Sequence, residues 1–168
     1  ATKKSNEVMA YSYSNIFKLP ITVMRFFTVY GPYGRPDMAL FKFTKGISNK
    51  TKIDVFNNGK HVRDFTYIDD VTHSIELLIK KPPKNLIPYE IYNISSSNPE
   101  KLGFFIKLIE KNLNVKGRLN YKDLQKGDVI KTFGSNKKIV NKIKFKPVTK
   151  INEGIKKFII WYKKYYEK

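Results

Sequence analysis

The chain has 168 residues, of which 41% are hydrophobic, and its 12 phenylalanines and 11 tyrosines are typical of a globular domain. Its net charge of +19 would suit nucleic acid or an anionic membrane, but only four of the 33 basic residues are arginines and the lysines are scattered, which argues against a nucleic-acid binder. The lack of cysteine excludes disulfides, and no apolar run approaches the roughly 20 residues of a membrane span, so we expect a soluble, cytoplasmic protein.

Periodicity and turn residues predict alternating helices and strands. In the first half, the expected elements are a helix over 1–17 ended by Leu19-Pro20, a buried strand over 21–27, a loop, a helix over 38–48, and strands over 52–56 and 61–65 joined by a hairpin turn at Asn57-Asn-Gly59. In the second half, they are a helix over 68–80, a strand over 91–95, a helix over 99–113, a strand over 118–121, and helices over 135–140 and 151–166. This order predicts an α/β sheet with a small mixed lobe.

The most informative stretch runs from residue 25 to residue 39 and reads Arg-Phe-Phe-Thr-Val-Tyr-Gly-Pro-Tyr-Gly-Arg-Pro-Asp-Met-Ala. A strand signal passes directly into a loop broken by glycine and proline, and such loops at strand ends are where α/β proteins bind ligands. Arg35 stands between Gly34 and Pro36, and its guanidinium matches a carboxylate or a phosphate. The stretch therefore predicts a loop that binds an anionic ligand.

Three segments of the chain form a pattern, namely Ala1-Thr-Lys-Lys-Ser-Asn-Glu7, the stretch 25–39, and Val62-Arg-Asp-Phe-Thr-Tyr-Ile-Asp-Asp70. Together they resemble the carboxy-terminal half of nucleotide-sugar epimerases of the extended short-chain dehydrogenase/reductase family, in particular the UDP-glucuronate 4-epimerases, and the similarity extends to about residue 138. The resemblance implies the carboxy-terminal part of a Rossmann-type doubly wound fold plus a small mixed α/β substrate-binding lobe, mainly 31–60 and 82–140. All 168 residues are expected to form one fragment.

The resemblance places the family's catalytic tyrosine two positions before Ala1. No Gly-x-x-Gly-x-x-Gly or Gly-x-Gly-x-x-Gly occurs in the chain, so the turn that holds a dinucleotide pyrophosphate is not among these residues. We therefore expect the amino-terminal Rossmann half to be missing, which the lack of an initiator methionine fits, and we expect the fragment to be inactive alone. When full length, the protein is expected to form a homodimer.

For the catalytic centre and the NAD cofactor, the resemblance nominates four residues. Lys3 matches the lysine that contacts the nicotinamide ribose and lowers the pKa of the catalytic tyrosine. Thr28 matches a position beside the hexose ring, although it also reads as an ordinary β-branched strand end. Val29 and Tyr30 match backbone positions near the nicotinamide carboxamide, and Tyr30 also reads as a packing aromatic.

For the UDP-sugar substrate, Arg35 matches an arginine near the sugar carboxylate or phosphate, with a solvated loop arginine as the alternative. Arg63 matches the arginine that clamps the pyrophosphate, and its alternative is a local salt bridge with Asp64 or Asp69. Asp128 matches the aspartate that binds the uridine ribose, although Lys126 replaces the usual proline there and an ordinary turn remains open.

Other candidates have weaker support. Met38, Val55 and Phe56 could line the uracil pocket or belong to the core. His61 and His73 have no partners at metal-ligand spacing and are expected to be surface or packing residues, and no metal is expected. A different UDP-sugar epimerase, decarboxylase or dehydratase remains an alternative function, as does a basic polyanion-binding module.

Overall fold

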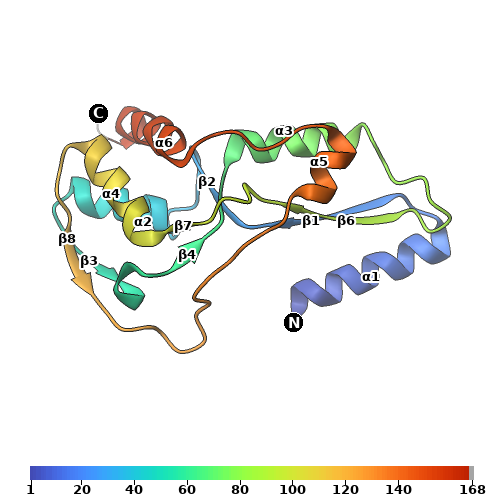
Figure 1. The fold of residues 1–168 in the computed structure, drawn as a ribbon, viewed down its shortest axis with the longest axis horizontal. Coiled ribbons are helices and arrows are strands. Elements are labelled where there is room, and N and C mark those ends of the chain that lie inside the picture. Colours follow the sequence, from blue (N-terminus) through green and yellow to red (C-terminus); the bar gives the residue numbers. More distant parts are fainter. Residues whose placement is uncertain (167–168) are drawn as a thin grey trace.

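The computed structural model describes residues 1–166, in which helices and strands alternate along the chain (Figure 1). The helices are α1 (Thr2–Phe17), α2 (Ala39–Ser48), α3 (Ile68–Ile79), α4 (Leu102–Leu113), α5 (Lys137–Ile143) and α6 (Ile151–Tyr166). The strands are β1 (Ile21–Phe26), β2 (Thr28–Tyr30), β3 (Lys52–Val55), β4 (Val62–Arg63), β5 (Phe65–Tyr67), β6 (Tyr89–Ile94), β7 (Glu100–Lys101) and β8 (Arg118–Tyr121). Within the described residues, no helix combines the length and apolar character needed to cross a membrane.

Strand pairing is mainly parallel. β1 pairs with β6, β2 with β5, and β3 with β8, each in parallel, whereas the two-residue strands β4 and β7 pair antiparallel. Parallel pairing requires a crossover between the strands, and the helices between them supply it. The predicted α/β class is confirmed by this alternation.

One hydrophobic cluster forms where α3 and α5 pack on the β1–β6 pair. In Figure 1 these two helices lie on one side of the pair and α1 on the other. Tyr92 and Ile94 of β6 are buried against Val71 and Leu78 of α3. The helix predicted over residues 1–17 is confirmed, but its apolar side chains, such as Val8 with 62% exposure, remain largely in solvent.

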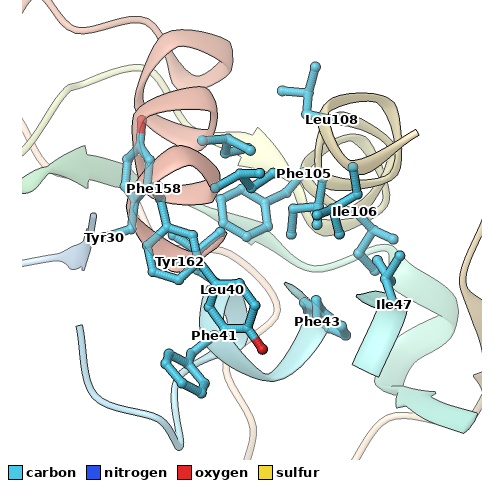
Figure 2. Packing of buried hydrophobic residues seen from close by; sticks show 14 of the residues in the cluster. Tyr30, Leu40, Phe41, Phe43, Ile47, Phe105, Ile106, Leu108, Phe158 and Tyr162 are labelled. Carbon is cyan, nitrogen blue, oxygen red and sulfur yellow. The ribbon is translucent and has the colours of Figure 1, made fainter. Parts of the chain in front are cut away.

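A second, larger cluster is built by α2, α4 and α6 around β2, β3 and β5. Figure 2 shows aromatic and aliphatic side chains of this cluster that come from β2, α2, α4 and α6. Phe65 stacks on Phe105 with ring centroids 4.2 Å apart, and Tyr30 meets both rings edge-on. Tyr30 belongs to this cluster, whereas its neighbour Val29 packs on the other, so β2 joins the two cores.

The predicted hairpin at Asn57-Asn-Gly59 is wrong. Residues 56–59 form a 3₁₀ turn in which Asn57 and Asn58 have φ values of 51° and 48°. Asn58 and Gly59 have the positive φ that an Asn-Gly turn requires, but β3, which precedes the turn, pairs with β8, and β4, which follows it, pairs with β7. Local turn chemistry therefore gave the backbone conformation correctly and the strand partner incorrectly.

Other boundaries also differ from prediction. Residues 61–65 are divided between β4 and β5, and the helix predicted from residue 99 begins at Leu102 because Glu100 and Lys101 pair with β4. Within that helix, Phe104 is 44% exposed, whereas Phe105 is fully buried. The final helix is confirmed, with Ile155, Phe158, Ile159 and Tyr162 all buried.

Candidate functional site

A large groove, with a volume of about 990 Å³, lies along α2, the start of β3 and β4. It brings together five residues that the sequence nominated from distant positions, namely Thr28, Met38, Phe56, Arg63 and Asp128. Its lining combines aromatic and aliphatic surface with lysine, arginine and aspartate side chains. This mixture of apolar walls and a few charged groups is typical of a small-molecule site.

Arg63 is held at the groove by three hydrogen bonds. Its Nη2 donates to Asp128 Oδ1 at 3.0 Å, and its Nη1 donates to the carbonyls of Val62 and Ile130 at 3.2 Å. The local salt bridge with Asp64 or Asp69, which the sequence left open, does not form. The guanidinium is instead fixed against a segment 65 residues later in the chain.

His61 is a groove residue that sequence reasoning missed. It is only 4% exposed, and its Nε2 lies 3.0 Å from Asp128 Oδ2. Asp128 therefore has one carboxylate oxygen near Arg63 and the other near His61. A signal was present, because side chains two positions apart on an extended segment share a face, and His61 precedes Arg63 by two. His73 is exposed and packs edge-on to Phe145.

Asp64 fixes the backbone beneath the groove. Its carboxylate is fully buried and accepts hydrogen bonds from Ser96 N at 3.0 Å, Ser96 Oγ at 2.8 Å and Gly134 N at 3.1 Å. Three donors on two separate loops therefore converge on one side chain. Because a buried carboxylate is stable only when its oxygens are satisfied, this arrangement fixes both loops relative to β4 and β5.

The loop over residues 31–38 begins where β2 ends. Gly31 has a φ of 143°, and a Cβ at this position would overlap Ile68, so the turn requires glycine. Arg35 is exposed and pairs with Asp37 through two hydrogen bonds of 3.0 and 3.1 Å. Its side chain also lines a small cavity of about 40 Å³ with Thr28 and Gly34.

The remaining nominated residues have different surroundings. Thr28 lines both the groove and the small cavity, and Val29 and Tyr30 line the small cavity. Burial raises the pKa of Tyr30 well above its ordinary value, so its phenol stays neutral at physiological pH. Val55 is fully buried in the larger core and lies outside the groove.

Lys3 is exposed in the first turn of α1 and lines neither cavity. One turn further along the helix, Glu7 accepts hydrogen bonds from Arg25 Nε at 2.6 Å and Arg25 Nη2 at 2.7 Å. Arg25, together with Lys4, lowers the pKa of Glu7 to about 2. This bidentate pair fixes α1 against β1, and with it the position of Lys3 on the helix.

Comparison with known proteins identifies the family. The model of the NAD dependent epimerase/dehydratase family matches residues 1–95, which is more than half of the chain. The chain belongs to this family. The resemblance inferred from the sequence is therefore confirmed.

Relatives within the epimerase/dehydratase family match the chain from end to end. Protein CapI of Staphylococcus aureus is 48% identical over 100% of this chain and 54% of its own length. A probable UDP-glucuronate 4-epimerase of Rhizobium meliloti is 40% identical over 100% of this chain and 54% of its own length. The chain thus spans about half the length of these relatives.

A solved structure in the same family has this fold. The UDP-glucuronic acid 4-epimerase from Bacillus cereus, in complex with UDP-glucuronic acid and NAD, superposes with a TM-score of 0.90 at 29% identity. The match covers 98% of this chain and 52% of that protein. The predicted fold class, the carboxy-terminal part of a Rossmann-type α/β fold with a substrate lobe, is confirmed.

Proposed function

We propose that this chain is the carboxy-terminal half of an NAD-dependent UDP-glucuronate 4-epimerase, which converts UDP-glucuronate to UDP-galacturonate through a 4-keto sugar. The observation that carries the proposal is the groove, because it collects Thr28, Arg63 and Asp128 from three distant parts of the sequence. Relatives named as UDP-glucuronate 4-epimerases, at 36–40% identity, support the choice of substrate.

Arg63 and Asp128 would hold the nucleotide. A pyrophosphate in the groove would take the place of the Asp128 carboxylate beside Arg63 Nη2, because a guanidinium binds phosphate as well as carboxylate. Asp128 would then accept a hydrogen bond from the ribose. Met38 and Phe56 provide apolar groove surface for the uracil ring, and Val55 would act from beneath as a core residue.

Thr28 and Arg35 would hold the sugar. Thr28 lines both the groove and the small cavity. The hexose of a nucleotide sugar whose UDP occupies the groove would therefore contact the Thr28 hydroxyl. Arg35 lines the small cavity and is paired only within its own loop among the described residues, with Asp37 and Met38. A sugar carboxylate could therefore replace Asp37 as the partner of Arg35 without disturbing the core.

The residues of this chain that would contact NAD are Lys3, Val29 and Tyr30. They fit the cofactor in two respects, since the Lys3 ammonium is exposed and the end of β2 borders the small cavity. When bound, NAD would supply reversible hydride transfer at C4 of the sugar, with return to the opposite face of the 4-keto sugar. Lys3 would stabilise the phenolate of a catalytic tyrosine through its positive charge.

This assignment implies a division of the chain. We propose that residues 31–60 and 82–140 supply most of the nucleotide-sugar lobe, with the remainder completing a dinucleotide-binding domain. The tyrosine and the glycine-rich turn would come from an amino-terminal half, and the complete protein would act as a homodimer. The 168 residues by themselves would then bind nucleotide sugar without converting it.

Calorimetric titration of UDP and UDP-glucuronate tests the site. We expect Arg63→Ala to weaken the binding of both ligands by about tenfold or more, since a hydrogen bond between charged groups is lost. Arg118→Ala is the matched control, because Arg118 is exposed on β8, outside the groove, and carries the same charge. Equal losses for the two variants would refute the site, and displacement of UDP by a polynucleotide would favour a polyanion-binding module.

Turnover tests the reaction. We expect protein expressed from its complete coding sequence, supplied with NAD, to convert UDP-glucuronate to UDP-galacturonate, as followed by NMR. A decarboxylated or dehydrated product would assign a different member reaction to the same groove. Turnover by the purified 168-residue polypeptide with added NAD would refute the proposed division between two halves.

A further inference from the structure

Tyr33 has an unusual combination of properties for a residue in the substrate-facing loop. Its side chain is 82% exposed, and its backbone has a φ of 58°, in the left-handed region that non-glycine residues seldom adopt. An exposed aromatic residue in a strained backbone conformation requires a compensating interaction. The structure supplies one from the opposite end of the sequence.

The ring of Tyr33 contacts the indole of Trp161 in α6, with ring centroids 5.1 Å apart and planes inclined by 56°. Trp161 is itself packed against the buried Phe158, at 5.4 Å, and stacked on Tyr165, at 5.5 Å. Its Nε1 is buried and makes no hydrogen bond within residues 1–166, so Trp161 acts here through ring packing. The indole thus provides a fixed surface that is anchored to the larger core.

Arg35 has no comparable anchor of its own. Its hydrogen-bond partners among the described residues, Asp37 and Met38, belong to the same loop. Its side chain is 73% exposed, so packing does not hold it either. Whatever fixes the loop relative to the core therefore also fixes the position of Arg35, and the ring contact lies only two residues before it.

We propose that Tyr33 is a positioning residue, which by packing on Trp161 holds Arg35 where it can select a sugar that bears a carboxylate. The inference rests on the proposed function, because it assumes that Arg35 meets the sugar acid. A loop that is already ordered loses less conformational entropy when ligand binds, so the contact should increase affinity only for ligands that use Arg35. UDP without a sugar provides the comparison.

Two substitutions at Tyr33 separate the ring from the backbone. Tyr33→Asn removes the ring but retains a residue that tolerates positive φ, whereas Tyr33→Phe keeps the ring. In protein expressed from its complete coding sequence, we expect Tyr33→Asn to weaken the binding of UDP-glucuronate by about tenfold and the binding of UDP by less than about twofold. Tyr33→Phe should bind both ligands with the affinity of the unaltered protein.

Tyr165→Ala is the matched control, because it removes another aromatic neighbour of Trp161 that lies on the same helix as the indole. It should leave both affinities unchanged. Trp161 is also the single tryptophan of these 168 residues. We expect UDP-glucuronate to change its fluorescence, as measured by the difference from Trp161→Phe, and we expect Tyr33→Asn to abolish that change.

The outcomes distinguish this inference from the function on which it rests. If Arg35→Ala lowers the preference for UDP-glucuronate over UDP but Tyr33→Asn does not, the positioning role is overturned and the proposed function stands. If Arg35→Ala leaves that preference unchanged, both the role of Arg35 and the positioning role are overturned. A loss of UDP affinity in Tyr33→Asn equal to the loss of UDP-glucuronate affinity would mean a general structural effect and would also overturn the proposal.

Discussion

Arg63 Nη2 lies 3.0 Å from Asp128 Oδ1, although the two residues are 65 positions apart. The contact attaches a segment that is exposed from residue 121 to residue 130 to the short strand β4. Two backbone bonds of the neighbouring Val62, from Val62 N to Ile130 O at 2.9 Å and from Thr132 N to Val62 O at 3.0 Å, complete the attachment. One wall of the groove is therefore formed by residues that are far apart in the sequence.

A double-mutant cycle on Arg63 and Asp128 should show coupling. Because both side chains are partly exposed, solvent screens the pair and we expect a coupling free energy of only about 1 kcal/mol in urea unfolding. His61, near the other oxygen of Asp128, should remain in place in each variant. Strict additivity of the two single substitutions would show that the ion pair does not contribute to stability.

Asp64 should be among the most sensitive positions in the chain. Asp64→Ala removes the acceptor of the buried Gly134 N and one of the two acceptors of both Ser96 N and Ser96 Oγ. We expect it to destabilise the fold by about 3 kcal/mol, because three hydrogen bonds to a charged group are lost and a buried donor loses its partner. Ser96→Ala removes one of these donors together with its bond and should cost only about 1 kcal/mol. Chemical denaturation followed by circular dichroism measures both, and equal losses would contradict the hub role of the carboxylate.

The Glu7–Arg25 pair should make stability depend on acid. Arg25 and Lys4 hold the pKa of Glu7 at about 2, below its ordinary 4.5, so the ionised carboxylate stabilises the folded state. Its contribution is complete above pH 4.5 and is lost as the pH falls from there towards 2. The stability difference between the unaltered protein and Glu7→Gln should therefore be present at neutral pH and shrink across that range.

Urea midpoints measured at a series of pH values test this dependence. Asp123→Asn is a suitable control, because Asp123 is exposed and its side chain forms no ion pair among residues 1–166. If the stability difference between the unaltered protein and Glu7→Gln stays constant down to about pH 2, the Glu7–Arg25 pair does not cause the pH dependence of stability.

Gly154 should not tolerate a larger side chain, although it lies within a helix. Alanine stabilises a helix over glycine by roughly 1 kcal/mol, but here a Cβ would lie 2.7 Å from Tyr67 Cδ2 and 2.8 Å from Tyr30 Cε2. Because overpacking costs about 1–3 kcal/mol, we expect Gly154→Ala to lower stability by ~1 kcal/mol net. Lys156→Ala, at an exposed position of the same helix, should be nearly neutral, and thermal unfolding compares the two.

Much of the site could be predicted from local sequence. The glycine and proline residues after β2 indicated a loop, and Arg35, Arg63 and Asp128 were nominated from their motifs. The burial of His61 and the partner of Arg63 could not be predicted in the same way, because both depend on where the exposed segment before Ile130 crosses β4. Spacing along one strand carries no information about that crossing.

The sequence by itself determined the helices, the α/β class and the family, because periodicity, turn residues and motifs are local and survive without knowledge of neighbours. It also determined the positive φ of the Asn58-Gly59 turn. Tertiary structure alone decided that β3 pairs with β8, that Asp128 lies between His61 and Arg63, and that Tyr33 rests on Trp161. Each of these contacts joins distant segments, and its free energy exists only once the core has brought those segments together.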